Sequence, residues 1–273
     1  MLALLGAGCG QVETASTSVG YVESGLPLLP GGTLDVGSTF SDLSIEDEGQ
    51  YRTLVYTWPD GRLSVASRVN RFELGDLVVP YMRHMVAAQL FVPEDSRALM
   101  IGTGGGAIIH YLQARYPDVA MDSVDIDPVV TDLARTWFGV EESASVRLHT
   151  ADGFDFIAAA ADGSYDLIYM DAFLRPAAAT DPSGIPLKLK TLAFYEDLQR
   201  ILKPQGVVSF NLHRNEVTDQ DLKLIEQSFG FFQLLTVEKS RNIVVLASPA
   251  EALVPRALKP DAPAWLQAVA EQL

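Results

Sequence analysis

Along most of this chain, short segments that are apolar, or in which apolar and polar residues alternate, are separated by longer amphipathic segments. Five of the short segments have the pattern of strands of a buried parallel sheet. They are expected to end near Gly102, Asp125, Thr150, Asp171 and Asn211. The segments between and after them predict helices over residues 107–116, 128–138, 153–161, 191–202 and 218–229. Strands that alternate with helices predict an α/β fold. Residues 231–238 and 242–247 are expected to close the sheet as an antiparallel pair.

The first third of the chain has a different pattern. Residues 33–70 contain short β-like runs, and Trp58-Pro59-Asp60-Gly61 supplies a turn signal, so we expect a small antiparallel cap. A linking helix is predicted over residues 71–92. The resulting organisation is a flexible leader, a cap with its linking helix, a Rossmann-like nucleotide-binding catalytic domain and a C-terminal tail. These parts are predicted to span residues 1–32, 33–92, 93–250 and 251–273, respectively.

A glycine-rich turn follows the first core strand. It contains Gly102, Gly104 and Gly106, and Asp125 follows 23 residues after Gly102 at the end of the next strand. Glycine lets the backbone approach a ligand that side chains would exclude. An acid at the second strand's end can accept hydrogen bonds from a ribose diol. The two features together predict a site for an adenosine-containing cofactor. The G-x-G-x-G form favours an S-adenosyl compound over a dinucleotide, whose sites usually have G-x-G-x-x-G, so an NAD-dependent oxidoreductase is a distant alternative that this form disfavours.

Further acids follow the later strands. Asp152-Gly153 comes after the third core strand, and Asp171 ends the fourth. Ligands of parallel α/β sheets bind outside the carboxyl ends of the strands, so Asp125, Asp152 and Asp171 are expected to converge on one crevice. Each acid taken singly is also explained as a helix N-cap or a solvated loop residue. Their shared placement favours a functional site.

Composition narrows the chemistry. The chain has 273 residues and a formal net charge of −15, which argues against nonspecific nucleic-acid binding. Its four histidines have no metal-ligand spacing and there is a single cysteine, so no metal site is predicted. An apolar run of 18 residues, as a membrane-spanning helix requires, does not occur.

The single cysteine leaves two alternatives for location. Residues 1–10 end in small residues around Cys9 and resemble the end of a bacterial lipoprotein signal, although the basic start of such a signal is missing. One hypothesis is therefore a membrane-anchored lipoprotein with a lipid on Cys9. The other hypothesis is a protein of the cytoplasm, which is the compartment in which sulfonium cofactors are made.

Several motifs together resemble the spermidine synthase-like family of polyamine aminopropyltransferases. The resemblance covers roughly residues 33–248. It is carried by residues 81–85, 101–106, 124–128, 151–153, 165–173, 194–195 and 202–204. It implies a Rossmann-like class I methyltransferase fold with a small N-terminal β-rich cap, and by analogy with relatives a homodimer. It also implies S-adenosylmethionine or decarboxylated S-adenosylmethionine as co-substrate, with a small-molecule amine as acceptor.

The resemblance also implies roles for single residues. Gly102, Gly104 and Gly106 would line the tail of the donor, and Asp125 would hold its ribose hydroxyls. Asp152, with Gly153 beside it, would meet the adenine amino group. Asp171 would accept a proton from the attacking amine or orient it. We also expect Tyr81, His84 and Tyr169 as contacts to the acceptor or to Asp171, with an ordinary helix-surface histidine and a core-facing helix stripe as the alternatives for His84 and Tyr81.

The chain departs from the family pattern at the places that bind cationic amines. Gly105 stands where the family usually has an Asp, and no second acid follows Asp171 in the run to Pro176. Arg83 or His84 stands where the family has a Glu, and the Gln of the N-terminal hairpin is not evident. Lys188 and Lys190 are also expected to repel a diamine. Three hypotheses follow: an aminopropyltransferase-like enzyme, an S-adenosylmethionine-dependent methyltransferase, and a noncatalytic nucleotide-binding relative, with or without a lipid anchor.

Overall fold

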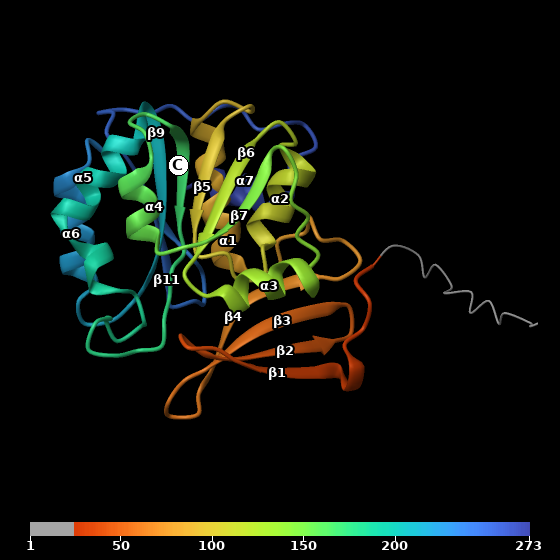
Figure 1. Cartoon of the computed structure of the whole chain (residues 1–273). Helices are drawn as coiled ribbons and strands as arrows, with labels where there is room; N and C mark the ends of the chain where they lie inside the picture. The colour runs from red at the N-terminus through yellow and green to blue at the C-terminus, as the bar shows by residue number, and fades with distance from the viewer. Residues whose placement is uncertain (1–24) are drawn as a thin grey trace, which may run out of the picture.

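A seven-stranded sheet forms the centre of the molecule in the computed structural model, which describes residues 25–273 (Figure 1). The strand order is β10-β11-β9-β8-β5-β6-β7, and only β11 runs against the other strands, pairing antiparallel with β10 on one side and with β9 on the other. This confirms the predicted parallel sheet with its closing antiparallel pair. The strands are β5 (Arg97–Ile101), β6 (Ala120–Asp125), β7 (Val146–Thr150), β8 (Tyr165–Met170), β9 (Leu202–His213), β10 (Phe231–Thr236) and β11 (Asn242–Ser248).

Helices cover both faces of this sheet, and two apolar clusters fill the spaces between sheet and helices. One face carries α1 (Pro80–Met85), α2 (Ala107–Arg115), α3 (Pro128–Thr136) and α7 (Ala264–Ala270). The other carries α4 (Gly153–Ala159), α5 (Leu192–Ile201) and α6 (Thr218–Ser228). All six residues of the central strand β8 are buried, as expected for a strand covered on both faces.

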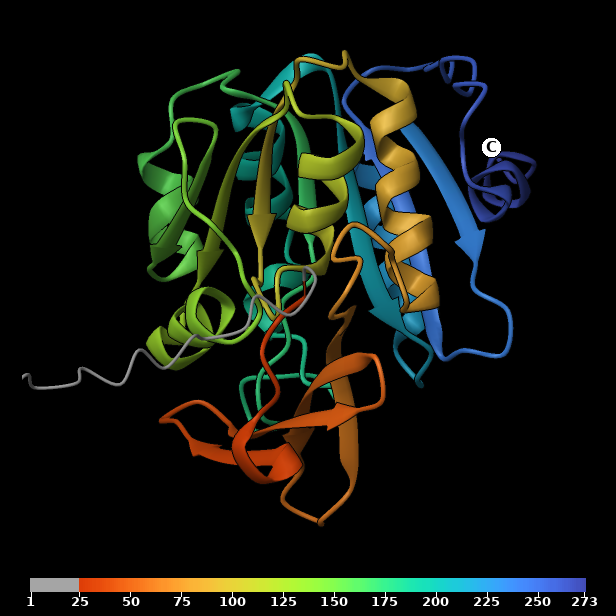
Figure 2. The same ribbon diagram turned by 90° about the vertical axis from the view of Figure 1, so that its right-hand side faces the viewer.

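The predicted cap is a separate four-stranded antiparallel sheet in the order β1-β2-β3-β4. Its strands are β1 (Thr33–Gly37), β2 (Asp42–Glu48), β3 (Tyr51–Thr57) and β4 (Leu63–Asn70). Figure 2 shows the cap below the end of the large sheet toward which the parallel strands point. The cap therefore lies over the edge where ligands of such sheets bind.

The linking helix is shorter than the predicted span of residues 71–92. It begins at Pro80, which occupies the first helical turn, and continues as a 3-10 helix over Val86–Phe91. The preceding residues form turns, and Leu77 pairs with Val69 through an isolated bridge. Proline favours the first turn of a helix because it has no N–H to donate there, so the helix starts at Pro80.

A buried ion pair joins the cap to the N-terminal segment and to the large domain. Arg52 is fully buried; its guanidinium donates to the Asp47 carboxylate and to the carbonyl oxygens of Trp137 and Pro27. Burial alone would raise the pKa of Asp47, but hydrogen bonds from Arg52 and from the Leu29 N–H outweigh it and lower this pKa. Residues 25–32, which we predicted as part of a flexible leader, are thus packed on the cap. Cys9 lies outside the described residues, so the lipid anchor and the cytoplasmic alternative stay predictions.

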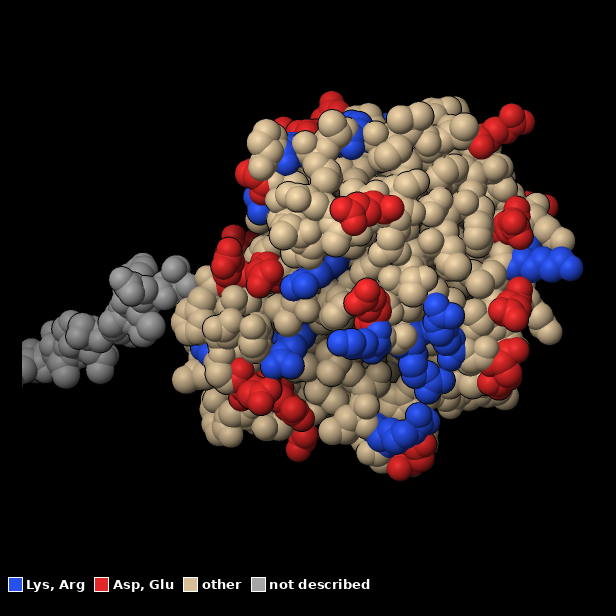
Figure 3. All heavy atoms as spheres, turned by 180° about the vertical axis from the view of Figure 1, so that it is seen from behind, with Lys and Arg blue, Asp and Glu red and all other residues tan. Residues whose placement is uncertain are grey.

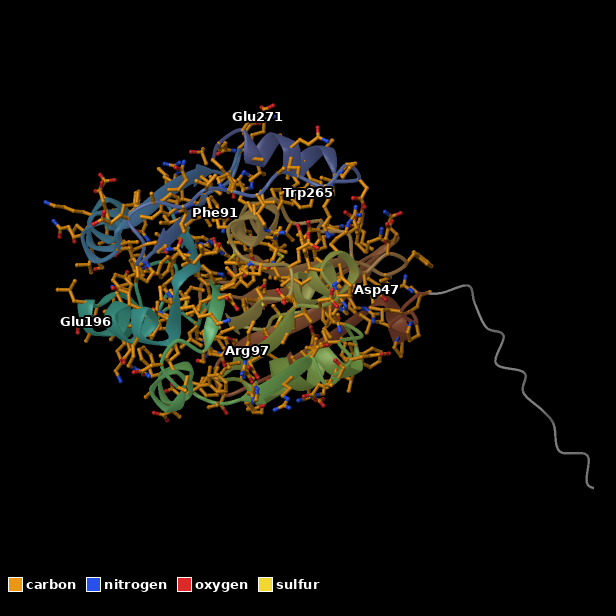
Figure 4. All side chains as sticks on the ribbon, turned by 90° about the horizontal axis from the view of Figure 1, so that it is seen from above. Asp47, Phe91, Arg97, Glu196, Trp265 and Glu271 are labelled. Atoms are coloured by element: carbon orange, nitrogen blue, oxygen red, sulfur yellow. The ribbon has the colours of Figure 1, made fainter. Side chains whose placement is uncertain are left out.

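The C-terminal tail packs on the α1 side of the large sheet. Helix α7 brings the Trp265 ring to 5.7 Å from the Tyr111 ring, and the Arg83 guanidinium lies over Trp265. Figure 4 labels Trp265 on the C-terminal helix and Phe91 on the segment below it. Phe91 in turn contacts Phe231 of β10, at 5.7 Å between ring centroids.

The molecular surface carries charges of both signs. Figure 3 shows the back face, where Lys and Arg side chains gather in the lower half and acidic side chains border them. Among residues 25–273, no helix is long and apolar enough to span a membrane.

Candidate active site

A cavity of about 500 Å³ lies at the carboxyl ends of the central strands, between the large sheet and the cap. Its floor is the glycine-rich turn after β5 together with the ends of β6, β8 and β9. Its roof comes from β3, β4 and the turn between them, and one wall is the loop of residues 172–190. The volume falls in the range of small-molecule sites.

Gly102 brings two strand ends together at this floor. Its φ is +95°, and a Cβ atom there would lie 2.1 Å from the carbonyl oxygen of Asp171. No side chain fits in that space, and the backbone conformation also favours glycine. Gly104 and Gly106 also have positive φ values, and Gly106 is the N-cap of α2. Gly102 and Gly104 line the cavity, while Gly106 closes the turn behind it.

Asp125 holds this turn in place from the end of β6. Its carboxylate accepts hydrogen bonds from the backbone N–H groups of Thr103, at 2.8 Å, and of Asp127, at 3.0 Å. Burial raises its pKa to about 6 against the effect of these bonds. A carboxylate oxygen can accept two hydrogen bonds, so the Asp125 carboxylate can accept further bonds from a diol in the cavity.

Asp127 connects the same region to the cap. One of its oxygens caps α3 by accepting from the Val129 N–H, and the other accepts from the Ser38 hydroxyl at 2.6 Å. Ser38 follows β1, so this bond and the Arg52 contact with Trp137 hold the cap against the large domain.

Asp152 and Gly153 line the next part of the cavity. Asp152 is exposed and caps α4 by accepting from the Phe154 N–H at 2.9 Å. Asp152 is therefore a helix N-cap, which was the alternative explanation for this acid, and it also lines the cavity.

Asp171 lies at the end of β8, next to the glycine turn. Its two oxygens accept from the Tyr81 hydroxyl, at 3.0 Å, and from the Asn211 side-chain amide, at 2.7 Å. Asn211 in turn accepts from the Asn242 amide at 2.9 Å. Burial raises the pKa of Asp171 to about 6, and the two hydrogen bonds lower it in part. A carboxylate with this pKa suits proton transfer near neutral pH.

Two residues expected at the site lie elsewhere. Tyr169 is fully buried, faces the α1–α2 side of the sheet and has a pKa raised well above its usual value by burial. Alternation along β8 explains this, because Ile168 and Met170 face the opposite side. His84 lies on α1 with its ring nitrogens near the Pro80 carbonyl and Gln272. Neither side chain lines the cavity, so both expectations were wrong, whereas Tyr81 does reach Asp171.

The cap contributes residues that the sequence did not single out. Tyr56 and Trp58 line the cavity from β3 and the turn after it. The pKa of Tyr56 is raised by burial and then by the carboxylates Asp125, Asp127 and Asp171, so its hydroxyl stays neutral. Only the docking of the cap places these side chains near Asp171, and no spacing along the chain signals it. Asn211, in contrast, was foreseeable as the end of a core strand.

The loop after β8 is tied down by a buried ionic cluster. Lys190 pairs with both Asp181 and Asp221, and all three side chains are nearly inaccessible to solvent. Asp181 also accepts from the backbone N–H groups of Ser183 and Ile185. The expectation that Lys190 repels a diamine was therefore wrong, since its charge is compensated. Lys188 does line the cavity, with its ammonium over the Phe154 ring.

Residues 78–242 match the model of the spermine/spermidine synthase domain. A polyamine aminopropyltransferase of Vibrio vulnificus is 31% identical over 219 residues, which are 77% of this chain and 69% of that protein. The chain belongs to the spermine/spermidine synthase family. The family relatives are transferases, which confirms the predicted enzyme class.

Solved structures show the same fold. A probable spermidine synthase from Corynebacterium glutamicum aligns with a TM-score of 0.69 at 19% identity, covering 88% of this chain and 86% of that one. Human methyltransferase-like protein 13, in complex with SAH, aligns with a TM-score of 0.59 at 24% identity, covering 71% and 90%. At these identities the likeness concerns the fold, and it confirms the methyltransferase-like sheet with an N-terminal cap.

This member of the spermine/spermidine synthase family has no room for an acid at position 105. A Cβ atom on Gly105 would lie 2.7 Å from the ring of Phe138 and 2.9 Å from the hydroxyl of Ser67. Phe138 is fully buried and so cannot swing away. Phe138 and Ser67 thus occupy the space that the Asp usual in the family would need.

Within residues 25–273, no cluster of three or more His, Cys, Asp or Glu side chains is arranged to hold a metal ion.

The raised pKa of Asp171 makes a prediction about pH. Between pH 5 and 8 an alkylamine stays protonated, so if Asp171 is the base for an amine acceptor, its own ionisation sets the pH profile. Because the acidic form of Asp171 cannot accept that proton, kcat/KM for the amine should fall about tenfold per pH unit below pH 6 and level off above it. The measurement is made at saturating donor, which removes the contribution of Asp125 to donor binding. A flat profile from pH 5 to 8 would contradict this assignment.

Proposed function

We propose that the protein alkylates a small-molecule amine, using an S-adenosyl nucleotide as donor and Asp171 as the base or amine-orienting acid. The observation that carries the proposal is the position of Asp171, which is partly buried, has its pKa raised to about 6 and directly adjoins the glycine turn. Donor and acceptor would therefore meet between the turn and this carboxylate. Membership in a family of transferases supports the same reaction class.

The proposed binding of the donor uses the floor of the cavity. Asp125 would accept hydrogen bonds from the ribose hydroxyls, while Asp152 and Phe154 would meet the base. Gly102 and Gly104 let the backbone approach the donor tail, since no Cβ atom stands in the way. Human methyltransferase-like protein 13 shares this fold and was solved in complex with SAH, which supports an S-adenosyl ligand for this protein.

The proposed chemistry is a single in-line displacement. The sulfonium donor is already activated, so the protein's main task is to align the amine with the carbon that is transferred. The amine ammonium gives a proton to Asp171, its nitrogen forms the N–C bond, and the C–S bond breaks to release a neutral thioether. Tyr81 and Asn211 fix the Asp171 carboxylate through two hydrogen bonds and leave its other lone pairs for the amine.

Analysis of the released thioether tests this proposal and separates two donors. The protein is incubated with either S-adenosylmethionine or its decarboxylated form and with a panel of primary amines, and the products are identified by mass spectrometry. Aminopropyl transfer releases methylthioadenosine, and methyl transfer releases S-adenosylhomocysteine. If neither thioether forms faster than in the absence of protein, the noncatalytic hypothesis replaces this proposal.

Methyl transfer is the second candidate, and the packing at Gly105 favours it. No carboxylate fits at this position, so none can bind the ammonium of decarboxylated S-adenosylmethionine there or repel the carboxylate of S-adenosylmethionine.

The variant Gly105→Asp should destabilise the fold by about 2 kcal/mol or more, because its side chain overpacks the site against Phe138. Urea unfolding measures this loss. A fully stable variant that gained affinity for the decarboxylated donor would show that the site is a simple family site lacking one acid.

A further inference from the structure

The acceptor end of the cavity combines one carboxylate with one guanidinium. Among the described residues, the acids that line the cavity are Asp125, Asp152 and Asp171. The first two belong to the donor end, because they follow β6 and β7 beside the glycine turn and α4. Asp171 therefore remains as the carboxylate for an acceptor, and Arg175 lines the same cavity from the loop that follows it.

Arg175 is available for a ligand. Its Nε is buried and has no hydrogen-bond partner within residues 25–273. Its one ion pair with a described residue runs from Nη2 to the Asp42 carboxylate at 3.0 Å, and the Asp42 side chain is 62% exposed. Exposed ion pairs contribute little and exchange readily with other anions. A buried donor without an acceptor is costly, so a ligand that accepts from it gains affinity.

Apart from the exposed Asp42 carboxylate, the groups at this end do not compensate the charge of Arg175. His213 packs its ring against Phe173, at 4.7 Å between centroids, and burial lowers its pKa, so it is neutral. Tyr56 and Trp58 add aromatic surface from the cap. Lys188, the other cation of the lining, lies over Phe154 at the donor end.

Geometry limits the size of what fits between the two charges. Arg175 follows Asp171 by four residues, so their α carbons are at most about 14 Å apart. Both side chains line one cavity, so a short bifunctional molecule can reach both. A diamine would place its second ammonium near the guanidinium, and like charges repel.

We propose that the acceptor is an amine that also carries a carboxylate, with its ammonium on Asp171 and its carboxylate on the guanidinium of Arg175. Such a zwitterion matches the one carboxylate and the one guanidinium that line the acceptor end of the cavity, whereas a doubly charged phosphate would leave an excess of negative charge beside Asp171. The planar guanidinium fork also fits a carboxylate through two parallel hydrogen bonds. This inference rests on the proposed amine alkylation and specifies its substrate class.

A set of four-carbon amines tests the inference. Protein saturated with S-adenosylhomocysteine or methylthioadenosine is titrated calorimetrically with 4-aminobutyrate, 1-aminobutane and 1,4-diaminobutane, which differ in the group at the far end. We expect 4-aminobutyrate to bind at least about tenfold more tightly than either of the others. Arg175→Gln should remove this preference, and Arg175→Glu should reverse it in favour of the diamine. Arg115→Gln is the matched control, since Arg115 pairs with Asp261 away from the cavity, and it should behave like the wild type.

The outcomes distinguish this inference from the proposed function. Equal or tighter binding of the diamine by the wild type would overturn the inference, as would a preference that Arg175→Gln leaves intact. If the nucleotide binds but none of the three amines does, the expected tight binding of 4-aminobutyrate is missing and the inference is overturned, while amine alkylation stands. If neither nucleotide binds, the proposed function fails at the first step and the inference fails with it.

Discussion

Replacing Asp171 by Asn is expected to lower turnover by about 10²–10⁴-fold while donor affinity changes little. The amide keeps the shape of the carboxylate but cannot accept the amine proton. It can still interact with Tyr81 and Asn211, so the fold should persist. The measurement is the rate of thioether release at saturating donor, together with calorimetric donor binding.

The control for this variant is Asp132→Asn on the exposed face of α3, which should leave both quantities unchanged. A variant at Asp171 with more than about a third of wild-type turnover would show that this carboxylate does not move the proton, because general-base catalysis contributes far more than threefold. A variant that loses donor binding and turnover together would instead assign Asp171 to the donor.

The variant Gly102→Ala should destabilise the protein by more than about 4 kcal/mol, because it introduces both steric overlap and backbone strain. Its Cβ atom would lie 2.1 Å from the Asp171 carbonyl oxygen, and its φ of +95° disfavours any residue with a side chain. Relief requires β5 and β8 to move apart at the point where donor and acceptor are proposed to meet. Donor binding should be lost even where the variant stays folded.

Urea unfolding and calorimetry measure these two effects. The matched control is Gly37→Ala in the edge strand β1, where a Cβ atom meets nothing within 4 Å and φ is not positive. That control should stay within about 0.5 kcal/mol of the wild type, as expected for surface changes. If Gly102→Ala is as stable as Gly37→Ala, the close approach of the two strand ends does not exist in solution.

The sequence predicted correctly those features that are determined by the residues of one short segment. The apolar runs located the sheet, and the acids after them converged because parallel strands end at one edge. Asp125, Asp152 and Asp171 thus lie around one cavity, as predicted. The glycine turn was readable for the same reason, since its conformation and its contacts are fixed locally.

Tertiary packing decided the rest. Tyr169 stands one residue before the end of a strand that is buried on both faces, so its uniformly apolar neighbours gave no sign of which side it faces. The charge on Lys190 is cancelled by Asp221, an acid 31 positions away on α6. Tyr56, Trp58 and the free donor of Arg175 are brought to the cavity only by the docking of the cap and the loop, which no single-sequence pattern encodes.

Calorimetric titration of the wild-type protein and of Asp125→Ala with S-adenosylmethionine, its decarboxylated form and methylthioadenosine tests the central claim most directly. The account predicts that the wild type binds at least one of the three, and that Asp125→Ala weakens this binding by about tenfold or more, because the ribose hydroxyls and the glycine turn both lose their acceptor. Binding that is absent for all three compounds, or that is unchanged in Asp125→Ala, would contradict an S-adenosyl donor at this cavity.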